Sequence, residues 1–286
     1  MSSAVTPSIA SSAQVHPTAH IDPTSTIGED VVVGAGVIIG PHCVIGARTR
    51  LRDRAMVVEH TTLGEDNDVH PNAVLGGDPQ DLAFTGDDRG KLIVGNNNVF
   101  REGVTLNRST QNGPPTVIGS NCFLMTNAHV GHNAQMGDNV IMANNGSLAG
   151  HSRVGNRCVM SANAAVHQFC NVGEGCMFQA CGAASMHVPP FVIVTNVNLI
   201  VGINSVGLRR HPEMNEDDRK QVKQLFRMVY RRPHGHPIVD VVATMQQQTW
   251  SPGAQRFVDF IIDTLNQEGP RDRGLCSAGA RIKSRH

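Results

Sequence analysis

The sequence predicts an all-β left-handed parallel β-helix with a small α-helical domain at its C-terminal end. Three observations lead to this prediction: an aliphatic residue recurs at every sixth position over most of the chain, aromatic residues make up only 4% of the 286 residues, and the period becomes helical after residue 215. A period of six is neither the two-residue period of a strand nor the 3.6-residue period of a helix. It fits a repeating unit of one short strand and one tight turn.

The repeat runs in two stretches. The first has eleven aliphatic residues: Val15, Ile21, Ile27, Val33, Ile39, Ile45, Leu51, Val57, Leu63, Val69 and Leu75. The second holds Val94, Phe100 and Leu106, then Ile118, Leu124, Val130, Met136, Met142, Leu148, Val154, Met160, Val166, Val172 and Phe178. Three units make one coil of about 18 residues, and coils stack by parallel pairing about 4.8 Å apart. Each aliphatic residue therefore points into a three-sided prism.

The fifth position of each unit also faces inward and must be small. Cysteine occupies it repeatedly, at Cys43, Cys122, Cys158, Cys170 and Cys176. We interpret these cysteines as small core residues. Seven cysteines, an odd number with no C-x-x-C pair, also argue against a disulfide scaffold or a structural zinc site.

The pattern divides the chain into three parts. We expect a disordered N-terminal tail at residues 1–14, the β-helix at 15–208 and a helical domain at 209–286 that ends in a poorly ordered tail from Gly269. Helical spacing after Asn215, and again over 238–248 and 254–266, predicts three helices. Two interruptions of the repeat, 76–92 and 111–116, predict loops that leave the scaffold, where functional residues tend to collect.

The charge pattern limits the partners. The formal net charge is zero, which argues against a nucleic-acid binder. The N-terminus lacks the basic and apolar regions of a signal peptide, and no stretch reaches the length of a membrane span. We therefore expect a cytoplasmic protein without stable membrane insertion.

Histidines gather in one part of the repeat. Residues 18 apart share a column, so His132 stacks with Gly150 and Gln168, and His151 and His167 lie one residue away. This clustering predicts a functional site on one edge of the prism. The other histidines of the repeat are expected to be exposed turn residues: His16, His20, His42, His60 and His70. Three imidazoles can also hold zinc, but Gly150 and Gln168 fill the places beside His132, so we expect neither a metal nor a cofactor.

Several strings carry a family resemblance. They are FLMTNAHVGH at 123–132, Ala143-Asn144-Asn145, LAGH at 148–151, AVHQF at 165–169, GDPQDL at 77–82 and VPPFVI at 188–193. Together they closely resemble the UDP-N-acetylglucosamine O-acyltransferases that begin lipid A synthesis, from about Val15 to the C-terminal helices. The resemblance implies a homotrimer with active sites between neighbouring prisms, which moves an acyl chain from acyl carrier protein to the sugar 3-hydroxyl of UDP-N-acetylglucosamine.

The resemblance also implies roles for individual residues. His132 corresponds to the general base, and the backbone N–H of Gly150 to the oxyanion donor. Substrate contacts are implied for Gln80, Asp81, His129, His151, His167, Gln168, Asn204 and Arg210, and the floor of the acyl groove for Ala180.

Four positions depart from the family pattern. Asn133 stands where the family usually has Asp, Ala83 where it has Lys, Asn107 where it has His and His211 where it has a second Arg. These changes leave open a different amino-sugar nucleotide, an acyl-coenzyme A donor, or a β-helix that has lost its chemistry. Residues 209–232 carry eight basic and four acidic residues, a surface that suits an acidic carrier protein.

Overall fold

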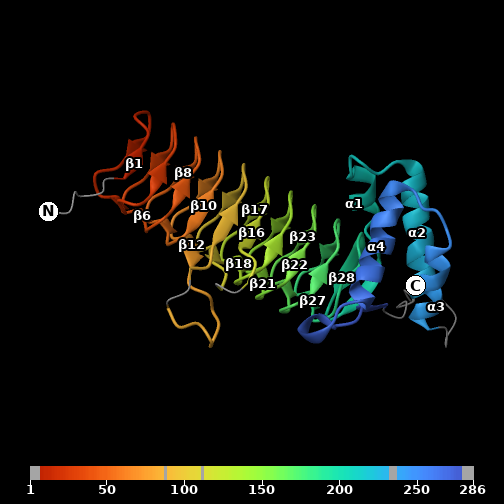
Figure 1. The fold of residues 1–286 in the computed structure, drawn as a ribbon. Coiled ribbons are helices and arrows are strands. Elements are labelled where there is room, and N and C mark those ends of the chain that lie inside the picture. The colour runs from red at the N-terminus through yellow and green to blue at the C-terminus, as the bar shows by residue number, and fades with distance from the viewer. Residues whose placement is uncertain (1–6, 87–88, 111–112, 232–236, 279–286) are drawn as a thin grey trace.

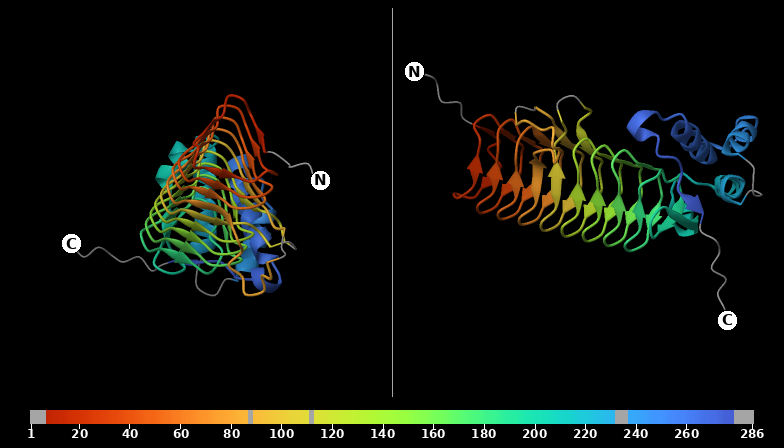
Figure 2. Two further views of the ribbon diagram at one scale, coloured as in Figure 1. Left: turned by 90° about the vertical axis from the view of Figure 1, so that its left-hand side faces the viewer. Right: turned by 90° about the horizontal axis from the view of Figure 1, so that it is seen from below.

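The computed structural model describes residues 7–86, 89–110, 113–231 and 237–278. Within these ranges the chain forms a three-sided prism of short parallel strands, and α-helices close the C-terminal end of the prism (Figure 1). Seen along its axis, the prism has a triangular cross-section (Figure 2). The predicted left-handed parallel β-helix with a C-terminal helical domain is confirmed.

Each side of the prism is one sheet. Sheet A holds β1 (Ser8–Ile9), β4 (Thr26–Ile27), β7 (Val44–Ile45), β10 (Thr61–Leu63), β13 (Leu92–Val94), β16 (Thr116–Ile118), β19 (Gln135–Met136), β22 (Arg153–Val154) and β25 (Asn171–Val172). Sheet C holds β3 (His20–Ile21), β6 (Ile38–Ile39), β9 (Met56–Val57), β12 (Val74–Gly77), β15 (Thr105–Asn107), β18 (His129–Val130), β21 (Ser147–Leu148), β24 (Ala165–Val166) and β27 (Ala183–Ala184).

Sheet B is longer and ends the prism. It holds β2 (Gln14–Val15), β5 (Val32–Val33), β8 (Arg50–Leu51), β11 (Asp68–Val69), β14 (Val99–Phe100), β17 (Phe123–Leu124), β20 (Ile141–Met142), β23 (Val159–Met160), β26 (Met177–Phe178), β28 (Val192–Thr195), β29 (Leu199–Ile203) and β30 (Ser277–Ala278). The β28–β29 pair is antiparallel, so the coil stops there.

The register shows where the two loops leave the scaffold. Most strand partners lie 18 residues apart, as His129 and Ser147 do. Thr62 instead pairs with Ile93, 31 positions on, so 13 extra residues lie between β12 and β13. Thr105 pairs with His129, 24 positions on, so six extra residues lie between β15 and β16. We call these loop 1 and loop 2. Both leave from the corner between sheets C and A, which we call the C–A edge.

The turns explain why the repeat is rich in asparagine. One residue in most turns has a left-handed backbone, including Asn133 (φ 59°), His151 (φ 60°) and Phe169 (φ 65°). Asparagine tolerates this region better than most side chains. The inward-facing cysteines are buried as predicted, and burial raises the pKa of Cys43 and Cys122 to about 11. These thiols are therefore neutral packing groups.

Four α-helices follow the prism in the described residues: α1 (Ser205–Arg210), which spans the predicted domain boundary at 208/209, α2 (Glu216–Tyr230), α3 (Ile238–Gln246) and α4 (Pro252–Leu265). Asn215 and Asp218 form a capping box at the start of α2, which fixes the beginning that the sequence predicted. The apolar faces of α2 and α4 pack together around Val222 and Phe257, and Arg256 of α4 pairs with Glu174 of the prism at 3.1 Å. No helix in the described ranges is long and apolar enough to cross a membrane.

The start of the chain corrects one expectation. Residues 1–14 were expected to be a disordered tail, but Ser8–Ile9 pair with Thr26–Ile27 and Gln14–Val15 pair with Val32–Val33. The repeat therefore begins before Val15, because Ile9 keeps the six-residue period although its side chain is 40% exposed. Residues 1–6 lie outside the described residues.

The other correction concerns the C-terminal segment, residues 269–278, which was expected to be poorly ordered. It contains a 3-10 turn, η1 (Gly269–Arg271), and the strand β30, which pairs with β29. Buried His187 holds it: its backbone N–H donates to Gly274 O at 2.8 Å, and its ring Nε2 donates to Arg271 O at 2.7 Å. The backbone N–H of Asn171 donates to the other ring nitrogen at 2.9 Å. These partners lie far away in sequence, so local composition could not reveal the order.

Candidate active site

The C–A edge brings His132 and Gly150 together. His132 lies in the turn after β18, and Gly150 follows β21 one coil further on. A side chain at Gly150 would place its Cβ 2.7 Å from His132 Nε2 and 2.9 Å from His132 Cε1. Only glycine therefore leaves the imidazole room at this position. The column that the sequence predicted is confirmed by the geometry.

Asn133 fixes which nitrogen of His132 carries the proton. The Asn133 amide Nδ2 donates to Pro114 O at 2.8 Å, while Asn133 Oδ1 accepts from the backbone N–H of Thr110 at 3.2 Å. The amide orientation is thus set by a carbonyl on one side and an N–H on the other. Because His132 Nδ1 lies 2.9 Å from Oδ1, it is the protonated nitrogen. The unprotonated Nε2 faces Gly150 and can accept a proton.

Asn133 also connects loop 2 to His132. Its backbone N–H donates to Thr116 Oγ1 at 2.7 Å, and its side chain bonds both Thr110 and Pro114. Asn133 is only 1% exposed. An aspartate would lose the donor that Pro114 O needs and would leave two oxygens facing each other. The amide at this departure from the family therefore has a structural reason.

The backbone N–H of Gly150 has no acceptor among the residues that the structure describes. The strand ladder does not use this position of the repeat. On other edges the N–H there is satisfied by a side chain from the next coil, as Ser120 N is by Asp138 at 2.7 Å and Asp138 N is by Asn156 at 2.8 Å. No such contact reaches Gly150, so its donor is free for a ligand oxygen beside the unprotonated Nε2 of His132.

A row of rings continues the edge. The His151 ring lies edge-on against His132, with ring centroids 5.2 Å apart, and stacks on Phe169 at 4.9 Å. Burial lowers the pKa of His151, and the charge of His132 lowers it further, whereas the charge of Asp81 raises it. Burial also lowers the pKa of His129, which hydrogen-bonds Thr105 Oγ1 at 2.8 Å. Both imidazoles are therefore held neutral near pH 7.

Loop 1 approaches the same edge. Asp81 Oδ1 accepts from the backbone N–H of Ala83 at 2.9 Å, which leaves its second carboxylate oxygen for a ligand. Gln80 and Leu82 are exposed beside it. Ala83, which replaces the Lys of the family, is exposed and supplies only this N–H.

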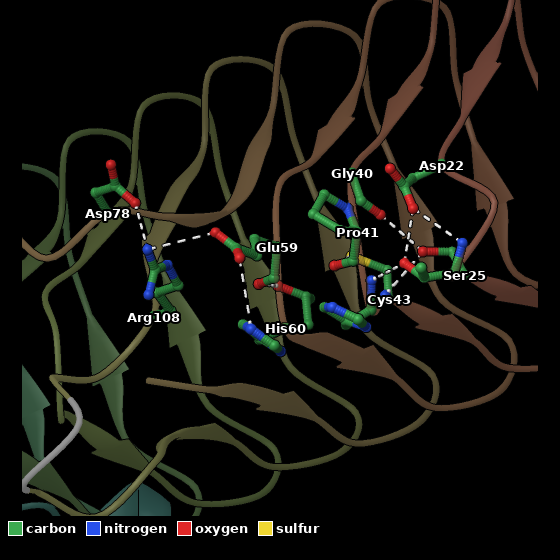
Figure 3. Close-up of polar contacts among 12 residues, drawn as sticks. Asp22, Ser25, Gly40, Pro41, Cys43, Glu59, His60, Asp78 and Arg108 are labelled. Carbon is green, nitrogen blue, oxygen red and sulfur yellow. Dashed lines mark hydrogen bonds and ion pairs between the residues drawn. The ribbon is translucent and has the colours of Figure 1, made fainter. Parts of the chain in front are cut away.

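The base of loop 1 is anchored by a buried arginine, Arg108, which no sequence pattern marks. Arg108 is 2% exposed and donates to Asp78 at 2.7 Å, with Glu59 at 3.6 Å (Figure 3). Asn107, where the family has His, donates to Asp78 O at 2.6 Å. This departure therefore holds loop 1 in place. A buried, doubly paired arginine next to a loop can be recognised only once the loop is folded back.

The other residues predicted to contact substrate fall into two groups, one on the C–A edge and one away from it. His167 and Gln168 are exposed on the C–A edge, next to Gly150 in the column. Asn204 caps α1 and donates to Gly175 O at 2.9 Å, Arg210 is exposed at the end of α1, and Ala180 follows β26. Within one chain these three are not brought to His132.

His211, the fourth departure, points inward. It is 6% exposed, lies 3.6 Å from Glu174 and packs edge-on against Phe191. It therefore belongs to the junction of the helical domain and the prism. Among the described residues, no group of three or more His, Cys, Asp or Glu side chains converges to hold a metal ion.

Family models match both parts of the chain. Residues 187–276 match domain 2 of UDP N-acetylglucosamine O-acyltransferase, and residues 12–47 and 115–150 match the bacterial transferase hexapeptide repeat. An acyl-(acyl-carrier-protein)–UDP-N-acetylglucosamine O-acyltransferase from Anaeromyxobacter is 38% identical over 71% of this chain and 79% of the relative. The same enzyme from Aeromonas salmonicida is 42% identical over 72% of this chain and 78% of the relative.

Comparison with solved structures leads to the same kind of enzyme. A UDP-N-acetylglucosamine acyltransferase from Bacteroides fragilis superposes with a TM-score of 0.82 at 32% identity, and one from Campylobacter jejuni with 0.83 at 29% identity. Each match covers 92% of this chain and 99% of the other. The fold and the repeat thus define a hexapeptide-repeat acyltransferase. More narrowly, the chain belongs to the acyl-(acyl-carrier-protein)–UDP-N-acetylglucosamine O-acyltransferase family.

The close approach of Gly150 to His132 gives a first prediction. Gly150→Ala should lower kcat/KM for acyl transfer about 100-fold, because the new methyl group displaces the imidazole and covers the free N–H. Its melting temperature should stay near the wild-type value, because the methyl group meets the end of a side chain. Gly202→Ala is the matched control, since a Cβ there meets nothing within 4 Å. An active Gly150→Ala enzyme would contradict the assignment.

Proposed function

We propose that this protein moves an acyl chain, of the 3-hydroxyacyl type, from acyl carrier protein to the 3-hydroxyl of UDP-N-acetylglucosamine, as the first step of lipid A biosynthesis in the cytoplasm. The observation that carries the proposal is the unprotonated Nε2 of His132 beside the unpaired N–H of Gly150. The names of the relatives, which are acyl-(acyl-carrier-protein)–UDP-N-acetylglucosamine O-acyltransferases, support the choice of substrates.

The chemistry follows from these two groups. His132 Nε2 takes the proton of the sugar 3-hydroxyl as its oxygen attacks the thioester carbonyl carbon. The Gly150 N–H donates to the oxyanion that forms. The carbon–sulfur bond then breaks, and the leaving thiolate takes the proton back from His132. A general base contributes about 10²–10⁴-fold and one oxyanion donor about 10²–10³-fold to the rate.

The acceptor binds beside the base in this proposal. The free oxygen of Asp81 and the exposed amide of Gln80 suit sugar hydroxyls, and His151, His167 and Gln168 extend the polar edge. His129 is neutral and already bonded to Thr105, so it adds a polar wall without a charge. No cofactor or metal is needed for this transfer, because the thioester is already activated.

The donor approaches from the helical domain in this proposal. Exposed Arg209 and Arg210, with the basic residues of α2, form a surface that suits an acidic carrier protein. Ala180 is exposed and small, which suits the floor of a groove for a long acyl chain. Asn204 and Arg210 contribute to the site of a neighbouring subunit, since neither reaches His132 of its own chain.

A homotrimer completes the site in this proposal. β-branched side chains on the outer face of sheet A remain uncovered within one chain, with Val44 43% and Ile93 40% exposed. We expect light scattering to give a mass about three times the 30.7 kDa of the chain. A mass of one chain at assay concentration would rule out a site shared between subunits.

The general base can be tested directly. His132→Ala should lower kcat by about 10²–10⁴-fold in an assay of thioester release with acyl carrier protein and UDP-N-acetylglucosamine. Its circular dichroism and melting temperature should match the wild type. His42→Ala is the control, because His42 is an exposed histidine of the same edge that stacks on His60. Loss of activity in both variants, or in neither, would contradict the assignment.

Asn133→Asp tests the partner of the base. A carboxylate stabilises the imidazolium form of His132, so the acidic limb of the kcat/KM profile should move to higher pH. The variant should also melt at a lower temperature, because an oxygen replaces the donor to Pro114 O. Asn139→Asp places the same charge in an equivalent turn on another edge (φ 59°) and should move neither. An unchanged acidic limb would show that Asn133 does not act through His132.

A further inference from the structure

The C-terminal segment places a cation on the active-site edge. Arg271 Nη2 donates to His151 O at 3.0 Å, and Nη1 donates to Asn171 Oδ1 at 3.3 Å. Its guanidinium carbon lies 5.9 Å from the centre of the Phe169 ring. Arg271 thus sits on the same row of rings, His151 and Phe169, that continues from His132.

The position of Arg271 is built into the fold. Its carbonyl accepts from His187 Nε2 at 2.7 Å, and His187 is completely buried. Three residues on, Gly274 O accepts from the His187 backbone N–H, and Cys276, 1% exposed, donates its N–H to His187 O at 2.9 Å. The segment is therefore held at Arg271 and again three and five residues further on, so the arginine is pre-organised before any ligand arrives.

The charge of Arg271 has no ion-pair partner among the residues that the structure describes. No carboxylate of the described residues forms an ion pair with Arg271, Arg153 or Arg273. Burial lowers the pKa of Arg271, and the neighbouring guanidinium of Arg153 lowers it further. Burial also lowers the pKa of His187, where the charges of Arg271 and Arg273 lower it further and that of Asp272 raises it. Three cations therefore lie near a single carboxylate, Asp272, and this excess of positive charge favours an anionic ligand beside Arg271.

We infer that Arg271 is an anion-binding residue of the active site, which takes a phosphate group of one of the two substrates. The inference rests on the proposed function for the identity of those substrates. Both carry phosphate: the nucleotide sugar as a diphosphate and the acyl carrier as a phosphodiester on its pantetheine arm. A planar guanidinium with donors left over after two hydrogen bonds suits either group.

Equilibrium binding separates the two sources. UDP and phosphopantetheine are titrated by calorimetry into the wild type and into Arg271→Gln. We expect the affinity for one of them to fall about 10-fold or more, the KM of the corresponding substrate to rise similarly, and kcat to change less than about threefold. Arg271→Lys should restore part of the affinity. A loss confined to UDP assigns the diphosphate, and a loss confined to phosphopantetheine assigns the carrier arm.

Two further variants control the experiment. Arg54→Gln removes an exposed arginine from a turn on another edge and should change neither affinity. Arg153→Gln removes a neighbouring positive charge, and the Arg153 side chain makes no hydrogen bond in the described structure. This variant should lower the affinity for the same ligand by a smaller factor. A lower melting temperature of Arg271→Gln would mean that its loss of affinity could come from a disturbed fold. The affinity of Arg153→Gln for UDP and phosphopantetheine is then the deciding measurement, and wild-type affinity for both ligands overturns the inference.

Other results overturn the inference directly. Wild-type affinity of Arg271→Gln for both ligands would show that Arg271 does not bind phosphate. A fall in kcat that Arg271→Lys does not restore, with both affinities unchanged, would show a purely structural role. If the proposed function is wrong, the result differs. The wild-type protein would then bind UDP with an affinity that depends on Arg271, but it would transfer no acyl group to UDP-N-acetylglucosamine.

Discussion

The 18-residue coil is the constraint on which the rest of this structure depends. Because each strand is only two or three residues long in most coils, no strand holds its place alone, and the stacking of identical inward positions supplies the register. A slip of one residue would turn the aliphatic side chains outward. The scaffold therefore fixes the position of every turn, and with it the distance between residues in one column.

The same constraint also places the Gly150 N–H and the His132 imidazole, the two groups of the proposed chemistry, next to each other. Backbone pairing between coils leaves one N–H of each turn unpaired, and side chains such as Asp138 and Asn156 satisfy it on another edge. At the C–A edge a glycine takes the place of such a pairing, beside a histidine that needs the space. The free N–H of Gly150 and the imidazole beside it thus follow from one regular pattern and not from a specially shaped loop. The loops add the groups that the repeat cannot supply.

The sequence predicted what depends on period and missed what depends on distant contact. The fold, the buried cysteines, the beginning of α2 and the column of His132 and Gly150 all follow from spacing, so they could be read from the sequence. The order of the C-terminal segment depends on His187, more than 80 residues away, and the burial of Arg108 depends on the return of loop 1. No local pattern marks either contact. The early start of the repeat at Ile9 was missed because one exposed aliphatic residue is a weak signal.

The departures from the family pattern are better explained together than singly. Asn107 and Asn133 each use an amide N–H to hold a loop, through Asp78 O and Pro114 O, and at Asn133 a carboxylate could not donate this bond. His211 is turned into the junction with Glu174, where it leaves the surface with one cation fewer. Arg271 adds a cation on the active-site edge itself. The chain therefore keeps His132 and Gly150, the proposed base and oxyanion donor, while its charges are distributed differently around them. A protein that had lost its chemistry would have no reason to keep Gly150 bare and its N–H unpaired, since a side chain from the next coil satisfies the same donor elsewhere at no cost to the fold.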